Sequence, residues 1–285
     1  MQKLTTTADA NVSKPKLVAP PGACDTHIHL FVPRYPYASD SPYRAKDAPP
    51  EMFFELQKTL GLSTGVIVSP GGYGKDYSML ADVLAKHPQR FRGIALVKDD
   101  IEPSELARLT KLGVRGMRMM SHARGQHVPN YSKEIAARVH EHGWHIQFYP
   151  HGTDITEYAD KLLELKNQIV LDHFASIPAE GGIDQPAVKA VLKMLDTGRV
   201  WLKLSGPMRC TQQNVPYPSV TPLAHLFVKH APERMVWGSD WPHVNLDGRE
   251  MPNDGDLLDL LAEWVPDAAV RNRVLAQNAN KLYGF

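Results

Sequence analysis

The sequence predicts an α/β fold, a single (β/α)₈ TIM barrel, and two observations carry this prediction. Short β-branched or apolar runs alternate along the chain with amphipathic helical stretches. Eight such runs occur within 285 residues, a length that suits a fold of about 250 residues. Because each parallel strand pair needs a crossover helix, this alternation favours a closed parallel barrel over the alternative, an open doubly wound sheet.

The expected strands share a short, buried, β-branched composition. They are Ala23–His29, Gly65–Ser69, Gly93–Val97, Gly116–Met120, His145–Tyr149, Ile169–His173, Val200–Ser205 and Met235–Asp240. The stretches between them have helical periodicity. They are Pro50–Leu60, Tyr77–His87, Pro103–Leu112, Ser132–His142, Ile155–Lys166, Gln185–Leu195 and Val220–His230.

Prolines and glycines mark several helix ends. Pro50 and Pro103 suit the first turn of a helix, where no N–H is needed. Gly113 and Gly143 follow expected helices, where a left-handed residue is favoured.

The longest loops follow the first and last strands, at 30–48 and 241–255, and long loops at this end of a barrel hold substrates.

Composition excludes several classes of partner. There are 32 basic and 31 acidic residues with no run of five like charges, so neither nucleic acid nor an anionic membrane is an expected partner. No apolar run approaches the ~20 residues of a membrane span.

Two cysteines, Cys24 and Cys210, are expected to be free thiols, which favours a cytoplasmic location. Residues 1–21 are predicted to be a flexible leader before the domain at 22–285.

Histidine and aspartate side chains gather where strands end. His27 and His29 stand two apart in the first strand, so both should point into one cavity. His173 ends the sixth strand, and Asp240 ends the eighth, which a barrel places beside the first. This set is suited to polarising a carbonyl, holding a metal and activating water.

These motifs resemble the amidohydrolase superfamily. The resemblance lies in Asp25-Thr26-His27-Ile28-His29, Asp172-His173 and Gly238-Ser239-Asp240-Trp241-Pro242-His243, and it extends from Pro20 to the C-terminus. Within the superfamily the chain resembles the branch of 2-pyrone-4,6-dicarboxylate hydrolase and the sugar-lactone hydrolases. The resemblance implies that Asp240 is a general base and that His27, His29 and His173 polarise the carbonyl.

The metal pattern of the superfamily is incomplete. Members with two metals carry Lys or Glu at the end of strand 4, where this chain has Gly116–Met120, so a binuclear site is not expected. A histidine commonly ends strand 5, but here His151 lies two residues beyond Tyr149. The resemblance implies that no cofactor is required. The alternative is one zinc or other divalent ion held by His27, His29 and Asp240, with His151 or His173 assisting.

Arginines at the barrel mouth indicate an anionic substrate. Arg118, Arg124 and Arg209 are placed to grip carboxylates bidentately. The resemblance implies that they bind substrate carboxylates, together with Tyr43, Tyr149 and His243. Two matches fail: Phe174–Ile177 lacks an arginine present in the pyrone hydrolases, and Ser69–Gly74 lacks their Ser/His pair.

The predicted function is therefore a hydrolase that opens a carboxylate-bearing lactone or pyrone ring. Its partner would be a small anionic lactone or pyrone, and a homo-oligomer is possible. The alternatives are a lactone isomerase of the same branch, a zinc-dependent decarboxylase and a non-enzymatic binding protein. Retention of Asp240 favours hydrolysis over isomerisation, and retention of all four residues argues against the binding protein.

Overall fold

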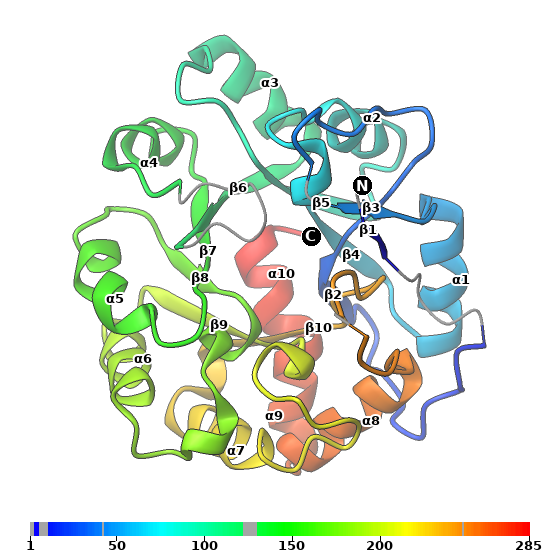
Figure 1. The fold of residues 1–285 in the computed structure, drawn as a ribbon, viewed down its shortest axis with the longest axis vertical. Helices are drawn as coiled ribbons and strands as arrows, with labels where there is room; N and C mark the ends of the chain where they lie inside the picture. The colour runs from blue at the N-terminus through cyan, green and yellow to red at the C-terminus, as the bar shows by residue number, and fades with distance from the viewer. Residues whose placement is uncertain (1–2, 6–10, 42, 122–129, 247) are drawn as a thin grey trace.

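The computed structural model describes residues 3–5, 11–41, 43–121, 130–246 and 248–285. Eight parallel strands form one sheet in the order β10-β9-β8-β7-β6-β5-β4-β2. A parallel bridge between Ile28 and Trp241 joins the two outer strands, and the His29 N–H donates to Trp241 O at 2.8 Å. The sheet thus closes, and the predicted (β/α)₈ barrel is confirmed (Figure 1).

All eight expected strands are present. They are β2 (Cys24–Ile28), β4 (Thr64–Val68), β5 (Phe91–Ala95), β6 (Val114–Met120), β7 (His145–Tyr149), β8 (Ile169–Leu171), β9 (Val200–Ser205) and β10 (Met235–Gly238). β8 and β10 end two residues earlier than predicted. The reason is that His173 and Asp240 have φ angles of 50° and 69°, which no extended strand can adopt.

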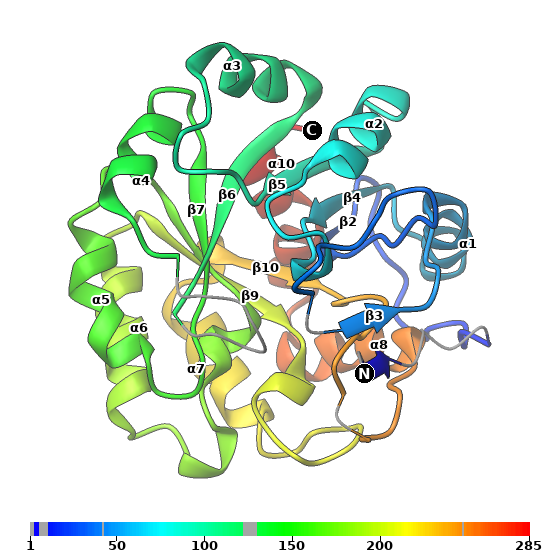
Figure 2. The same cartoon turned by 45° about the horizontal axis from the view of Figure 1, so that its top comes forward.

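The helices form a ring around the barrel (Figures 1 and 2). They are α1 (Pro50–Leu60), α2 (Ser78–Lys86), α3 (Pro103–Leu112), α4 (Lys133–His140), α5 (Ile155–Leu163), α6 (Pro186–Asp196), α7 (Thr221–His230) and α8 (Asp254–Trp264). Gly113 and Gly143 follow α3 and α4 with φ angles of 111° and 76°, as expected of helix-ending glycines. None of the described helices is both long enough and apolar enough to cross a membrane.

The C-terminal helices close the end of the barrel opposite the site. After α9 (Ala268–Asn272) and a π-helical turn at Arg273–Gln277, α10 (Asn278–Tyr283) lies near the centre of the ring in Figure 1. Its Ala279 and Tyr283 pack in one buried cluster with Cys24 of β2 and the apolar side chains of β4 and β5. The barrel therefore has a packed floor, and only its other end is available for a substrate.

Two segments of the N-terminal region contact the barrel. β1 (Lys3–Thr5) pairs in parallel with β3 (Tyr43–Ala45), a short strand in the loop after β2. Further along, the Ser13 and Leu17 N–H groups donate to side chains of Asn253 and Asp259 at α8. The flexibility of the leader and the boundary at residue 21 stay predictions.

Candidate active site

Four side chains converge at the open end of the barrel. His27 and His29 come from β2, His173 follows β8 and Asp240 follows β10. The Nε2 atoms of all three histidines lie 3.7 Å from Oδ1 of Asp240. Each of the four residues is at most 5% exposed. Strands that are far apart in sequence thus bring three imidazoles around one carboxylate oxygen, as the motifs predict.

An irregularity in β2 aims both of its histidines inward. The register against β4 shifts between Asp25 and Ile28, so Cys24 packs into the floor while His27 and His29 face the cavity. The Asp240 N–H donates to His27 O at 2.9 Å, which ties the end of β10 to β2. A Cβ on Gly238 would lie 2.8 Å from the Cβ of His27, so the close approach of β10 to β2 at this point requires glycine.

Asp240 is held as an ionised carboxylate. Arg209 donates to its Oδ2 from Nε at 3.0 Å and from Nη2 at 2.8 Å. Burial alone would raise the pKa of Asp240, but the guanidinium of Arg209 holds that pKa well below its usual range. Oδ1 is left to face the histidines and the cavity.

A hydrogen bond from the His29 ring to the backbone decides which ring nitrogen carries the proton. Its Nδ1 lies 2.8 Å from Val68 O, an atom that can only accept, so Nδ1 carries the proton. Burial lowers the pKa of His29 to about 3, so the ring is neutral at physiological pH. Its Nε2 therefore offers a lone pair, rather than an N–H, to Asp240 and the cavity.

The other two rings are also neutral. Burial lowers the pKa of His27 well below its usual value and that of His173 to about 4. His27 Nδ1 lies 3.2 Å from Oδ1 of Asp172, and its Nε2 is buried with no hydrogen-bond partner. Nδ1 of His173 lies 3.0 Å from the Ser205 hydroxyl, which can donate or accept, so this ring can present an N–H to a ligand.

The donor set fits a single divalent cation. His27, His29 and Asp240 each offer one ligand atom within 4.8 Å of the others, and so do His27, Asp172 and His173. The lone pair of His29 and the Oδ1 of Asp240 face each other without a proton between them, which favours a cation beside them. His151 is exposed and does not line the site, so it does not complete this set.

Three of these residues, His29, His173 and Asp240, border a pocket with a cavity volume of about 60 Å³. Its lining consists of His29, Tyr43, Gly71, Arg118, Met120, Tyr149, His173, Arg209, Asp240, Val244 and Asn245. The guanidinium of Arg118 lies over the Tyr149 ring at 5.4 Å, and its buried Nε has no hydrogen-bond partner within the described residues. Nε lies 3.8 Å from Oδ2 of Asp172, too far for a hydrogen bond, so no carboxylate of the described residues is hydrogen-bonded to this guanidinium. A guanidinium of this kind, beside an aromatic wall, is suited to binding an anionic group.

The predicted binding residues divide into three groups. Tyr43, Tyr149, Arg118 and Arg209 line the pocket. His243 does not, because the turn after Asp240 points it toward α8, where its Nε2 lies 3.0 Å from Asp254 Oδ1. Arg124 lies outside the described residues.

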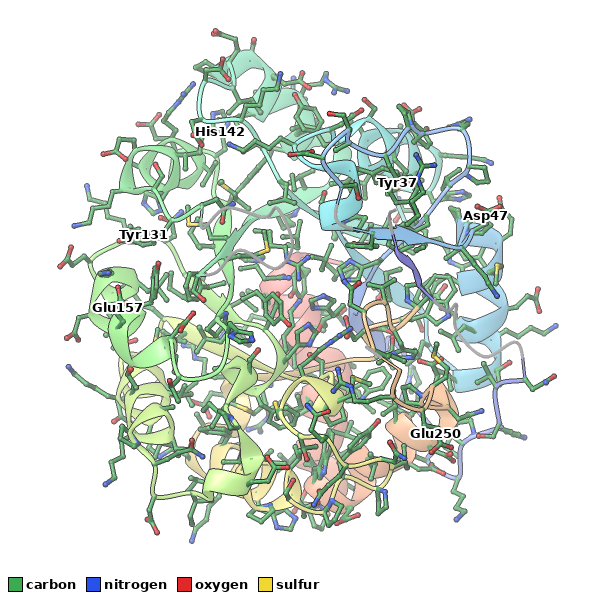
Figure 3. The ribbon with its side chains drawn as sticks, in the orientation of Figure 1. Tyr37, Asp47, Tyr131, His142, Glu157 and Glu250 are labelled. Carbon is green, nitrogen blue, oxygen red and sulfur yellow. The ribbon has the colours of Figure 1, made fainter. Side chains whose placement is uncertain are left out.

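Figure 3 shows the two sides of this end of the barrel. Tyr37 and Asp47, in the loop after β2, lie on the opposite side of the ribbon in this view from Tyr131 and Glu157. Tyr37 itself packs against Tyr73 with ring centroids 5.2 Å apart, and its hydroxyl donates to Ala45 O at 3.1 Å. These contacts hold the loop that carries Tyr43, and so they fix one wall of the pocket.

Sequence reasoning missed Lys203. This residue lies in the middle of β9, is 0% exposed, and has a pKa that burial lowers to about 8. The available signal was a lone lysine in the apolar run Val200–Ser205, because buried lysines are rare unless paired.

A closed parallel barrel with a histidine–aspartate cluster at the carboxyl ends of its strands defines a class, the barrel enzymes that activate water. The amidohydrolase family model matches residues 24–285, and the chain belongs to this family. The family that the motifs predict is thereby confirmed.

Three relatives align over nearly the whole chain. A 4-sulfomuconolactone hydrolase of Rhizobium radiobacter is 35% identical over 93% of this chain and 91% of its own. A 2-pyrone-4,6-dicarboxylate hydrolase of Comamonas testosteroni is 33% identical over 96% and 94%. A D-galactarolactone isomerase of Agrobacterium fabrum is 27% identical over 94% and 93%.

A solved structure has the same fold. It is described as a putative 2-pyrone-4,6-dicarboxylic acid hydrolase from Pseudomonas putida, and it superposes with a TM-score of 0.79 at 29% identity. The alignment covers 92% of this chain and 97% of that one. The two chains thus share the barrel fold.

Proposed function

We propose that this chain hydrolyses the ring ester of a lactone or pyrone that carries an acidic group. The observation that carries the proposal is the pairing of two sites in one pocket. An ionised Asp240 with three imidazoles at its Oδ1 shares the pocket with Arg118, whose guanidinium makes no hydrogen bond to a carboxylate of the described residues. Relatives named as hydrolases of sulfomuconolactone and of pyrone dicarboxylate support this substrate class.

The substrate is oriented by its anionic group. Arg118 binds this group, with Tyr149 beneath the guanidinium and Tyr43 on the neighbouring wall. Binding the anion here directs the ring toward the histidines. Such positioning converts the attack of water into an effectively intramolecular step.

Asp240 acts as the general base. Its Oδ1 takes a proton from water while the water oxygen attacks the ring carbonyl carbon. The ring C–O bond then breaks, and the proton passes from Asp240 to the departing oxygen. One water is consumed, and the product is an open-chain hydroxy acid or its keto tautomer.

The resemblance implies that all three histidines polarise the carbonyl, but only a ring that presents an N–H can stabilise the negative charge that develops on the carbonyl oxygen. His173 can do so by donating an N–H, whereas His29 presents only a lone pair. A divalent cation held by His27, His29 and Asp240 would polarise the carbonyl instead. The metal independence implied by the resemblance stays a prediction, and the proton positions favour the one-cation alternative.

Isomerisation of a lactone is the second candidate function. The relative named D-galactarolactone isomerase aligns over 272 residues, 94% of this chain. An isomerase would re-form a ring ester from the opened acyl group and would consume no net water. Hydrolysis therefore incorporates an oxygen atom from ¹⁸O water into the product, whereas isomerisation does not, and this difference separates the two functions.

The test is a substrate screen in ¹⁸O water. Lactones and pyrones bearing no, one or two carboxylates or sulfonates are incubated with the enzyme, before and after chelator treatment. We expect ring opening only with the acidic substrates, ¹⁸O in the new carboxylate, and loss on chelation that zinc reverses. Turnover of neutral lactones alone, or a rearranged ring without ¹⁸O, would contradict the proposal.

A further inference from the structure

A buried lysine lies directly beneath the histidine cluster. Nζ of Lys203 donates to Thr26 O and to Gln147 Oε1, both at 2.8 Å. The same Nζ lies 3.3 Å from Oδ1 of Asp172 and 3.3 Å from Nδ1 of His27. No part of Lys203 reaches solvent, so water does not screen its charge and these neighbours feel it strongly.

Asp172 completes this buried group. Its Oδ2 accepts from Gln147 Nε2 at 3.1 Å, and Nε of Arg118 lies 3.8 Å from the same oxygen. Its Oδ1 lies 3.2 Å from Nδ1 of His27. Lys203, Asp172 and His27 therefore place three polar atoms within 3.3 Å of one another, below the cavity.

The protons of this group can be counted. Thr26 O and Gln147 Oε1 take two of the three protons of Lys203, which leaves one. If that proton went to His27 Nδ1, Oδ1 of Asp172 would be a buried anionic oxygen facing a lone pair, with no donor. If it goes to Oδ1, the same oxygen also accepts from a protonated Nδ1, and every atom is satisfied. The second arrangement is favoured because an ionised oxygen accepts two hydrogen bonds and an imidazole nitrogen only one.

We propose that Lys203 and Asp172 are positioning residues that hold the His27 proton on Nδ1, so that its Nε2 directs a lone pair toward the centre of the histidine–aspartate cluster. This inference rests on the proposed function for its kinetic consequence, but not for its statement about the proton. Neither residue contacts a substrate in the pocket, because neither lines it. They act through His27, whose Nε2 lies 3.7 Å from Asp240 Oδ1.

The first test needs no variant and no substrate. Histidine labelled with ¹⁵N is introduced into the metal-free enzyme, and the His27 signals are assigned by their loss in His27→Gln. We expect an Nδ1 shift typical of a protonated nitrogen and an Nε2 shift typical of an unprotonated one. The reverse assignment overturns the proposal, whether or not the enzyme hydrolyses any lactone.

The second test separates positioning from a structural role. Lys203→Met combined with Asp172→Asn replaces the buried ion pair with a neutral pair of similar volume, which restores charge balance. The matched control makes the same two substitutions, Lys193→Met and Asp160→Asn, in an exposed pair whose charged atoms are 3.0 Å apart.

The two roles predict different kinetics. Positioning predicts that the neutral pair folds, loses about 10- to 100-fold in kcat with KM little changed, and shows proton density on Nε2 of His27. A folded neutral pair with wild-type kcat and an unchanged His27 spectrum would overturn the proposal. If the double variant does not fold, Asp172→Asn alone is measured in the same way, with the same outcomes deciding.

Discussion

Arg209 and Asp240 form the most direct ion pair of the site, with two hydrogen bonds from the guanidinium to one carboxylate oxygen. The same guanidinium donates to the backbone carbonyls of Val244 and Asn245 at 2.7 and 3.2 Å. It thereby fixes both the carboxylate and the loop that follows it. Arg209 is consequently engaged before any substrate arrives, whereas the Nε of Arg118 makes no hydrogen bond within the described residues.

Asp240→Asn should abolish turnover while leaving the pocket intact. The amide cannot accept a proton from water, so we expect kcat to fall by about 10²- to 10⁴-fold, the usual share of general base catalysis. Titration calorimetry with a slowly hydrolysed substrate should give a dissociation constant close to that of the wild type. Retained turnover would remove Asp240 from the role of base.

Arg118 and Arg209 should affect different kinetic constants. Arg118→Met removes the anion-binding charge, so we expect KM to rise about 10- to 100-fold, the value of one or two charge-assisted hydrogen bonds. Arg209→Met frees the reacting carboxylate, so its main effect should be on kcat. Steady-state kinetics on one acidic lactone checks both, and a shift of KM alone in Arg209→Met would contradict this division.

Metal binding can be tested apart from activity. We expect the purified enzyme to bind one equivalent of zinc per chain, and His29→Gln to bind far less, because one of the ligating lone pairs is lost. The control is His151→Gln, since His151 is exposed and outside the pocket. Elemental analysis after dialysis measures both. Equal zinc in His29→Gln and wild type would exclude this residue from the metal site.

The strand-end positions of the cluster were predictable for a physical reason. Alternation in a strand puts His27 and His29 on one face, and barrel closure brings the eighth strand to the first, so Asp240 had to meet them. Nothing in that reasoning depends on loop geometry. The same is true of Arg118, which alternation places on the inner face of β6.

The details that sequence could not give depend on backbone turns and buried pairing. His243 follows the predicted motif, but φ angles of 69° at Asp240 and 58° at His243 turn it away from the pocket toward Asp254. Lys203 was missed because a charged residue in an apolar run shows its role only when its partners are known. Those partners, Asp172 and Gln147, come from other strands.

His145 should make the fold sensitive to acid. Burial, with a further contribution from Lys203, lowers its pKa to about 3, whereas the unfolded chain has a value near 6.5. Between these values the unfolded state binds a proton that the folded state does not, so stability falls as the pH falls. A difference of one bound proton between the two states changes the free energy of unfolding by about 1.4 kcal/mol per pH unit.

His145→Gln should therefore flatten the pH dependence of unfolding. We expect the slope of the unfolding free energy between pH 4 and pH 6, obtained from urea titrations, to fall by about 1.4 kcal/mol per unit. The control is His140→Gln, since this side chain is exposed at the end of α4 and meets water in both states. An unchanged slope in His145→Gln would show that His145 takes up its proton equally in both states.

Gly206→Ala should impair the site more than the fold. Gly206 follows β9 with φ of 53°, and a Cβ there would lie 2.6 Å from Nδ1 of His173, the atom that contacts the Ser205 hydroxyl. The added methyl must displace the imidazole from Asp240, so we expect a large loss of kcat. The left-handed backbone adds a stability cost of about 1–2 kcal/mol.

Gly61→Ala provides the matched comparison for Gly206→Ala. Gly61 has the same left-handed conformation, with φ of 73° and ψ of 25°, but a Cβ there would meet its nearest atom at 3.7 Å, an ordinary van der Waals contact, so the substitution has the backbone cost without touching the site. Thermal unfolding should therefore shift similarly in both variants, while only Gly206→Ala loses activity. If both variants lost kcat equally, backbone strain alone would explain the effect, and the position of His173 relative to Asp240 would not be what limits turnover.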